Sequence, residues 1–370
     1  MRCPLVALNL KDLDFDGLSQ ALAPLAPTRT AVLKIFASVF AHGAQSMAEV
    51  KAAPQVSGPV RDWVQAHCEL PALEVVERRK ADDGFVKYLF RSPLGGQFEA
   101  VRIPIFDHKY VVCVSSQVGC ALGCDFCLTG KMGFSRNLSA WEILDQVMRV
   151  RAEADRPVRG VVFMGMGEPL LNYNETTRAA RVMCHPAGLA ISGQAITFST
   201  AGWVPGIRRY LKEEQPYRLA FSITSAIAHK RAQVLPVEQT HPLPTLVECV
   251  REYAQSRGTR AMLAYVMISG FNTGLEDALA LRDTFAGIPI VVDLIDVTDP
   301  TGKYHPPSEQ ELKTFRDHLQ VVGAPISRRY SGGKEIDAAC GTLWASQRGG
   351  VVLGEHGARS TEPRPSAGQL

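Results

Sequence analysis

The stretch Cys120-Ala-Leu-Gly-Cys124-Asp-Phe-Cys127 sets three cysteines at a C-x3-C-x2-C spacing. It follows a β-rich run at residues 110–114 and precedes a glycine-containing segment at 129–134. A short loop with this spacing can curl three thiolates around one iron-sulfur cube and leave the fourth iron without a protein ligand. An iron with a free position is a site for chemistry. The loop therefore predicts one [4Fe-4S] cluster per chain, held by Cys120, Cys124 and Cys127.

Two other interpretations of these cysteines stay open at this point. A structural zinc site normally needs four ligands, and no fourth Cys or His follows at finger-like spacing. Cys113 is a candidate fourth ligand, but it stands inside an apparent strand and out of step with the loop. Cysteines can also be incidental, because the free thiol packs well in interiors. The missing fourth ligand favours the cluster over zinc.

The segments around the loop predict an α/β fold, a partial (β/α)6 barrel with a small helical N-terminal domain. Helical patterns occupy residues 1–70, short β-rich runs occupy 71–112, and strands alternate with helices over 113–345. Residues 346–370 lose periodicity and predict a disordered tail. In the barrel we expect strands at 160–164, 195–199, 218–223, 262–268, 289–295 and 326–330, and helices at 140–151, 175–185, 244–256, 275–285 and 309–321.

Composition narrows the class of protein. The chain has 370 residues and nine cysteines, which excludes a small disulfide-stapled module. It contains neither an export signal nor an apolar segment of membrane-spanning length. We therefore expect a cytoplasmic protein, monomeric and without a membrane partner. A net charge of +3 permits nucleic-acid binding without arguing strongly for it.

An aromatic residue, Phe126, stands immediately before the last cysteine of the loop. With it, the loop resembles that of the radical S-adenosylmethionine (radical SAM) superfamily. The resemblance implies a radical SAM barrel whose open iron chelates the amino and carboxylate groups of S-adenosyl-L-methionine. It also implies an external electron donor, which reduces the cluster so that this cofactor is cleaved to a deoxyadenosyl radical. The protein supplies placement and excludes water.

Further segments between residues 98 and 341 resemble one family of that superfamily, the RlmN-type methyltransferases. These act on carbon 2 of adenine in 23S ribosomal RNA and transfer RNA. The ordered set is highly specific. It comprises Phe98-Glu-Ala-Val-Arg-Ile-Pro104, Cys113-Val-Ser-Ser-Gln-Val-Gly-Cys-Ala-Leu122, Gly133-Phe-Ser-Arg-Asn-Leu138, Met164-Gly-Met-Gly-Glu-Pro-Leu-Leu-Asn172, Ser199-Thr-Ala-Gly202, Tyr265-Val-Met-Ile268 and Ile336-Asp-Ala-Ala-Cys-Gly341.

The resemblance implies catalytic roles for Glu99, Cys113 and Cys340. Cys340 accepts a methyl group on sulfur, the radical abstracts a hydrogen from that methyl, and the carbon adds to adenine. Glu99 is the base that removes the C2 proton, and Cys113 releases the product by forming a transient disulfide with Cys340. Taken singly, each residue has a plainer reading, as a core or loop cysteine or as a carboxylate on the solvent face of a strand. Their joint occurrence with the cluster loop favours function.

The resemblance also implies cofactor contacts. Gly167 and Glu168 match positions that contact the cofactor's amino group, and Ser199 matches one that contacts its sugar or carboxylate. The glycines of Gly165-Met-Gly-Glu-Pro169 allow close approach of main chain to a ligand, although a tight turn is the alternative. Two further expected cofactor positions depart from the family. Ser222-Ile223-Thr224 replaces Ser-Leu-His, and Thr298 replaces an asparagine.

The loop before Cys340, Tyr330-Ser-Gly-Gly-Lys-Glu335, also lacks the family's Arg-Gly-Asp-Asp character. These departures leave the substrate in doubt, because such residues surround the target nucleotide. The first hypothesis is an enzyme that makes 2-methyladenosine in ribosomal RNA, transfer RNA or both. The alternatives are the same chemistry on another RNA position or substrate, and a non-catalytic iron-sulfur RNA-binding protein.

Overall fold

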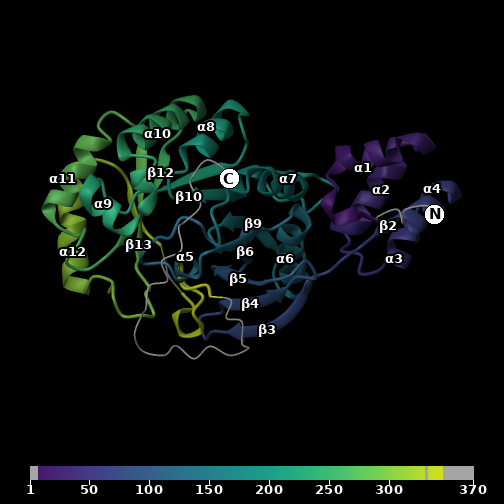
Figure 1. Cartoon of the computed structure of the whole chain (residues 1–370), viewed down its shortest axis with the longest axis horizontal. Helices are drawn as coiled ribbons and strands as arrows, with labels where there is room; N and C mark the ends of the chain where they lie inside the picture. The colour runs from purple at the N-terminus through teal and green to yellow at the C-terminus, as the bar shows by residue number, and fades with distance from the viewer. Residues whose placement is uncertain (1–6, 330–331, 345–370) are drawn as a thin grey trace, which may run out of the picture.

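The computed structural model describes residues 7–329 and 332–344 (Figure 1). The tail predicted to be disordered, 346–370, lies outside the described residues. The elements expected from the sequence are present with shifted ends. The division into an accessory domain at 1–70, a β-rich extension at 71–112 and a barrel at 113–345 stays a prediction.

A ten-stranded sheet forms the centre of the molecule, in the order β14-β13-β12-β11-β10-β9-β6-β5-β4-β3. Neighbouring strands from β14 to β6 in this order pair in parallel, and β5, β4 and β3 continue the sheet from β6 in antiparallel fashion. The central strands β12 and β13 are almost continuous apolar runs, as expected for strands with both faces covered. The bounds of the parallel strands are β6 Lys109–Cys113, β9 Val158–Phe163, β10 Ile196–Thr200, β11 Arg218–Ser222, β12 Ala261–Met267, β13 Ile290–Asp296 and β14 Ile326–Arg328, with β3 Glu74–Lys80, β4 Val86–Arg91 and β5 Gln97–Ile105 at the antiparallel edge.

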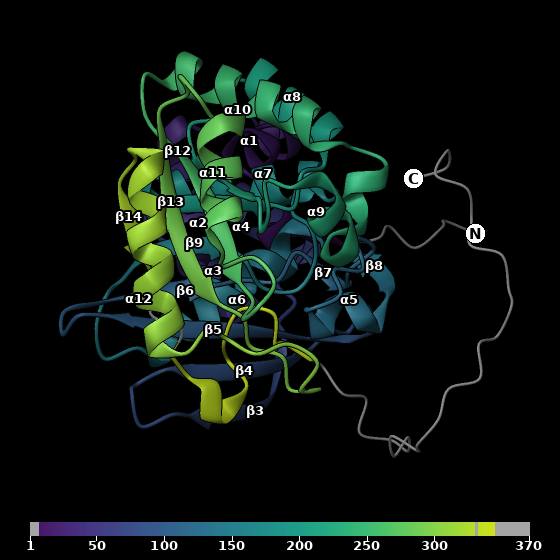
Figure 2. The same cartoon turned by 90° about the vertical axis from the view of Figure 1, so that its left-hand side faces the viewer.

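Helices follow each of the strands β6 and β9–β13 before the next parallel strand begins, so the predicted partial (β/α)6 arrangement is confirmed. Figures 1 and 2 show these helices on the outer side of the curved sheet. Two of them, α8 and α9, were not expected from the sequence. The helices are α6 Ala140–Glu153, α7 Tyr173–Cys184, α8 Val204–Lys212, α9 Ala228–Val234, α10 Leu243–Arg257, α11 Leu275–Thr284 and α12 Glu309–His318.

The N-terminal helices form a separate group at one end of the molecule (Figure 1). They are α1 Phe15–Leu22, α2 Arg29–Phe40, α3 Met47–Lys51 and α4 Gly58–His67, next to the short parallel pair β1 Leu8–Asn9 and β2 Cys68–Glu69. A buried ion pair ties this group to α6, because Lys11 Nζ lies 2.6 Å from Asp145 Oδ1. The ring of Phe15 also stacks on His185, just beyond α7.

The C-terminal segment 338–344 returns to the sheet at the carboxyl ends of the parallel strands. Gly341 O accepts a hydrogen bond from Leu128 N at 2.8 Å, and Leu343 O accepts one from Thr129 Oγ1 at 2.8 Å. Both donors belong to α5 Leu128–Met132, which follows the cysteine loop directly. The segment that carries Cys340 is therefore fastened to the loop that carries the three clustered cysteines.

Candidate active site

The cysteine loop is held between two short strands, β7 Gln117–Gly119 and β8 Phe134–Asn137, which pair in antiparallel fashion. Gly119 has φ +76°, and a Cβ there would lie 1.8 Å from Gly133 O. Only glycine fits at that position. At the loop's first cysteine, Cys120 N donates to Gly133 O at 2.9 Å. The backbone thus fixes where the loop leaves the sheet.

All three loop cysteines line a cavity of about 160 Å³ at the carboxyl ends of the parallel strands. Parallel α/β folds place their chemistry at this end. The predicted residues that line the same cavity are Cys120, Cys124, Cys127, Gly167, Glu168, Ser199, Ser222, Thr298 and Cys340. The chain segments between residues 120 and 340 that carried the sequence prediction therefore meet at one place.

Burial raises the pKa of each loop thiol, and the neighbouring thiols add to the shift. Within the described part of the chain, no three Cys, His, Asp or Glu side chains gather closely enough to hold one metal ion. A cube presents a different iron to each cysteine, so its ligands surround a wide group rather than a point. The arrangement gives the zinc interpretation no support.

Glu168 is a fully enclosed carboxylate beside the cysteines. Its Oε2 accepts a hydrogen bond from Ala201 N at 2.9 Å, and Oε1 accepts one from Leu170 N at 3.1 Å. Burial raises the pKa of Glu168 to about 7, against these hydrogen bonds. A cationic group bound in the cavity would favour the charged carboxylate.

A second cavity, of about 390 Å³, adjoins the first and is mostly apolar. Cys113, at the end of β6, lines the second cavity but not the first. Cys340 lines both cavities. Both residues are free thiols. Burial raises the pKa of Cys113 to about 12, and the neighbouring Cys340 adds to the shift. The two sulfurs therefore face one apolar space that opens toward the cysteine loop.

Arg329 stands at the junction of the two cavities, which it also lines. Its Nε donates to Asp293 Oδ2 at 2.9 Å, and its Nη1 contacts Met164 Sδ at 2.8 Å. Burial works against the charge of Arg329, but Cys340 and Asp293 raise its pKa. Asp293 projects from the apolar strand β13 into the second cavity. A fixed cation thus lies beside the Cys340 sulfur.

Glu99 lies in a third cavity, of about 210 Å³, separate from the other two. Register pairs Val101 with Cys113, so Glu99 shares the face of Cys113 and stands diagonal to it. Glu99 Oε1 lies 3.2 Å from Lys87 Nζ, and Oε2 accepts a hydrogen bond from Trp344 N at 2.8 Å. The C-terminal segment 338–344 therefore separates this carboxylate from the cysteine loop.

A protein-family model described as "Radical SAM superfamily" matches residues 114–281. A Myxococcus xanthus protein named "Probable RNA methyltransferase" is 69% identical over 346 residues, 94% of this chain and 97% of that protein. A Syntrophobacter fumaroxidans protein named "Dual-specificity RNA methyltransferase RlmN" is 40% identical, covering 91% of this chain and 98% of that protein. The chain belongs to the RlmN-type radical SAM RNA methyltransferases.

A solved structure agrees with this family. A radical SAM methyltransferase from Sphaerobacter thermophilus matches with a TM-score of 0.84 and 34% identity, over 92% of this chain and all of that one. This RlmN-type chain is accordingly an enzyme, a radical SAM methyltransferase. None of the helices in its described part has the length and apolar character needed to cross a bilayer.

Radical SAM membership implies S-adenosyl-L-methionine and a [4Fe-4S] cluster, and the described residues fit both. Beside the loop thiols, Asp296 Oδ1 and Thr298 Oγ1 are buried polar atoms without a hydrogen-bond partner in the described part of the chain. Both residues line the first cavity. A ligand with amino and hydroxyl groups would satisfy them, since buried polar atoms without a partner cost free energy.

Not every predicted cofactor residue of this RlmN-type chain reaches the cavity. Ser222 lines it, but Ile223 and Thr224 do not. Thr224 has φ +57°, is fully buried, and its Oγ1 has no partner among the described residues. The backbone turns at the end of β11, so that only the first residue of Ser222-Ile223-Thr224 faces the cysteines.

Sequence reasoning missed the Asp293–Arg329 pair. In the sequence Arg329 is the second residue of the basic pair Arg328-Arg329, which indicates no particular site. The usable signal was Asp293, a carboxylate inside an apolar strand, because such a group is buried only with a partner. The cofactor roles of Gly167, Glu168, Ser199, Ser222 and Thr298, and the catalytic roles of Glu99, Cys113 and Cys340, stay predictions.

Proposed function

We propose that this enzyme methylates carbon 2 of adenosine in 23S ribosomal RNA, transfer RNA or both, through a methyl-cysteine at Cys340. The observation that carries the proposal is the shared cavity of Cys113 and Cys340, of which Cys340 also faces the cysteine loop. Two free thiols so placed suit a covalent route that ends in a disulfide. The name of the Syntrophobacter fumaroxidans relative supports an RNA substrate of dual type.

Carbon 2 of adenine lies between two ring nitrogens and is electron-poor, so it does not attack an ordinary methyl sulfonium. When bound, the cluster and S-adenosylmethionine supply the methyl group and a carbon-centred radical. Cys340 holds the one-carbon unit next to the apolar cavity. Arg329, anchored by Asp293, places its guanidinium beside the Cys340 sulfur that takes up the methyl group.

Release of the product then falls to Glu99 and Cys113. Glu99 takes the C2 proton from the radical adduct between adenine and the Cys340 carbon, and the cluster, when bound, would take back the unpaired electron. Cys113 loses its proton and attacks the Cys340 sulfur, so that an S–S bond forms as the C–S bond breaks. The freed carbon takes a proton and becomes the methyl group. Cellular thiols reduce the disulfide.

In the described conformation Trp344 N caps the Glu99 carboxylate. Glu99 can therefore reach the adenine only if the segment 338–344 moves away from β5. The target base must also leave its stack to enter a cavity of this depth, as base-modifying enzymes require. We assign the enzyme an RNA partner and an external electron donor, and expect it to act as a monomer.

A second candidate keeps this chemistry but places the methyl group elsewhere in RNA. The departures at Ser222-Ile223-Thr224 and Thr298 favour it, because Ser222 and Thr298 line the cavity beside the cysteines. The Myxococcus xanthus relative, 69% identical, is named only as a probable RNA methyltransferase. Both candidates use Cys113 and Cys340 alike.

The test is anaerobic reconstitution of the cluster, followed by incubation with methyl-labelled S-adenosylmethionine and either ribosomal or transfer RNA. Nucleoside mass spectrometry then locates the label. Label in 2-methyladenosine supports the first candidate, and label in another nucleoside supports the second. The Cys340→Ala variant, prepared identically, is the control that must transfer no label. Unchanged transfer by that variant would refute both candidates.

A further inference from the structure

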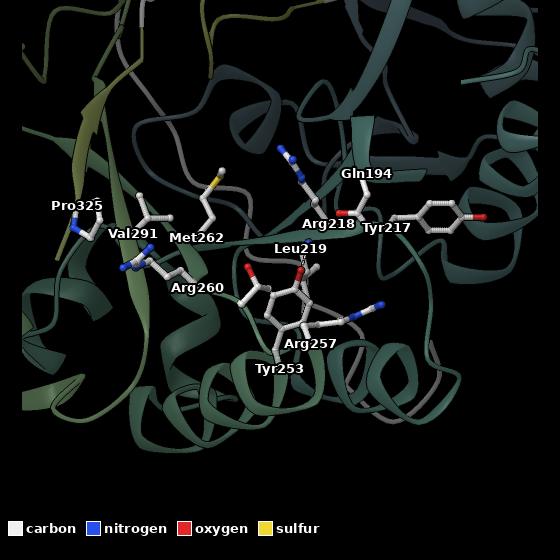
Figure 3. A pocket seen from close by; sticks show the side chains of 11 residues that line it. Gln194, Tyr217, Arg218, Leu219, Tyr253, Arg257, Arg260, Met262, Val291 and Pro325 are labelled. Carbon is white, nitrogen blue, oxygen red and sulfur yellow. Dashed lines mark hydrogen bonds between the residues drawn. The ribbon is translucent and has the colours of Figure 1, made fainter. Parts of the chain in front are cut away.

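A separate hollow of about 500 Å³ lies at the amino ends of the parallel strands (Figure 3). Strand β11 shows the separation, because Arg218 at its start lines this hollow and Ser222 at its end lines the cysteine cavity. Four residue steps of a strand span about 13 Å. The hollow is therefore distinct from the site described above. We call it the basic hollow, after its lining residues Arg218, Arg257 and Arg260.

The charge of the basic hollow is unbalanced. None of its lining residues is acidic. Within the described part of the chain, the side chains of Arg218, Arg257 and Arg260 make no ion pair within 4.0 Å. By contrast, Arg231 and Arg329 each have a carboxylate partner. Guanidinium groups left without a counter-ion at a concave surface attract anions.

The three arginines are carried by different elements, whose positions fix the backbone of each. Arg218 opens β11, Arg260 immediately precedes β12, and Arg257 ends α10. In Figure 3 they rise from different sides of the hollow around Tyr253, with their guanidinium ends apart from one another. Tyr253 Oη accepts a hydrogen bond from Leu219 N at 3.1 Å, which leaves the hydroxyl hydrogen for another acceptor. Spread cations with added donors suit a ligand that bears several anionic oxygens.

Phosphate is the anion that these groups fit best, because the planar guanidinium fork matches two phosphate oxygens at once. The volume lies in the range of small-molecule sites and suits a nucleotide. We propose that the basic hollow binds phosphate groups, either of a free nucleotide or of an RNA backbone. Met262 lines both this hollow and the cavity of Cys113 and Cys340, so the two spaces approach each other at this residue.

Arg257 is the last residue of α10, where an arginine also stabilises the negative end of the helix dipole, so its presence there has a second explanation. The decisive variant is therefore the double substitution Arg218→Ala/Arg260→Ala. Its matched control is Arg251→Ala/Arg316→Ala, which removes the same charge from two exposed arginines that lie outside the hollow. Both are prepared as the reconstituted holoenzyme, without S-adenosylmethionine, and titrated with ATP and with a short single-stranded RNA.

Two results support the proposal and separate the sources of phosphate. A tenfold or greater loss of ATP affinity in the double variant alone indicates a nucleotide site. Weaker RNA binding in the double variant alone, with the log–log salt slope reduced by about 1.4, indicates two backbone phosphates. Equal behaviour of the two variants toward both probes would overturn the proposal.

The RNA arm rests on the proposed function, whereas the ATP arm does not. The two failures are distinguishable because neither titration involves methyl transfer. Wild-type enzyme that binds a probe through Arg218 and Arg260 but makes no methylated adenosine would contradict only the proposed function. Enzyme that methylates adenosine while the two variants stay indistinguishable would contradict only the basic hollow.

Discussion

Glu99 and Lys87 form a buried ion pair across two strands of the antiparallel edge, with Oε1 and Nζ 3.2 Å apart. Register pairs Lys87 with Val101 and Leu89 with Glu99, so the pair is diagonal on one face of the sheet. Burial raises the pKa of Glu99, and the Lys87 ammonium is the largest influence that opposes the rise. Lys87 therefore opposes the effect of burial on the pKa of the proposed base.

Replacing Lys87 should change the pH dependence of methylation. A base acts only when deprotonated, so activity rises with pH through the pKa of Glu99. Lys87→Met removes the cation and raises that pKa further, which moves the acidic limb of the pH–rate profile to higher pH. Each unit of movement costs about tenfold in rate below the limb. Lys87→Arg keeps the charge and should leave the limb in place; a limb that stays put in Lys87→Met as well would remove Lys87 from this role.

Gly167 should not tolerate a side chain. Its φ is +99°, and a Cβ would lie 2.6 Å from Cβ and Cγ of Gln117, whose Oε1 accepts a hydrogen bond from Glu168 N. We expect Gly167→Ala to displace Gln117 and weaken S-adenosylmethionine binding at least tenfold, measured by equilibrium dialysis of the reconstituted enzyme. Gly95→Ala is the control, because Gly95 has φ +91° and nothing within 4 Å of the added Cβ. Both variants carry the backbone strain of about 1 kcal/mol, and only the first should lose cofactor. Equal cofactor affinity in both would contradict the placement of Gly167.

The N-terminal helices should depend on Lys11. Its Nζ contacts Asp145 at 2.6 Å and Pro71 O at 2.8 Å, and both charged side chains are almost fully buried. Lys11→Met leaves Asp145 with Arg149 as its charged partner, at the longer distance of 3.3 Å. The free energy of unfolding in urea should therefore fall by about 3 kcal/mol. The exposed pair Lys51–Asp62 provides the comparison, and Lys51→Met should cost less than about 1 kcal/mol. Similar losses in the two variants would show that burial of the Lys11 pair contributes little.

Local patterns predicted the cluster loop and the parallel sheet because spacing and apolar runs decide both. The helix α8 was not expected from the sequence for a local reason as well. Pro205 and Gly206 resemble a turn, yet Pro205 occupies the first turn of α8, where its missing N–H costs nothing. A proline and a glycine at the start of a segment therefore do not exclude a helix.

The rest of the site depends on contacts between distant residues. Asp293 and Arg329 meet only because β13 and β14 are neighbours in the sheet, which no local pattern encodes. The same holds for Glu99, where the approach of Trp344 places a backbone amide on the predicted base. Thr224 is the opposite case, a residue that the sequence predicted at the cofactor site. Its left-handed backbone conformation turns it away from the cavity of the loop cysteines.

Cys113→Ala tests the central claim most directly, since this variant can form the adduct between Cys340 and RNA but cannot release it. After anaerobic turnover and nuclease digestion, intact-protein mass spectrometry should find one adenosine-derived nucleotide joined through a one-carbon bridge to Cys340. The double variant Cys113→Ala/Cys340→Ala should carry none. Free methylated RNA at the wild-type rate from Cys113→Ala, with no adduct on Cys340, would contradict the account.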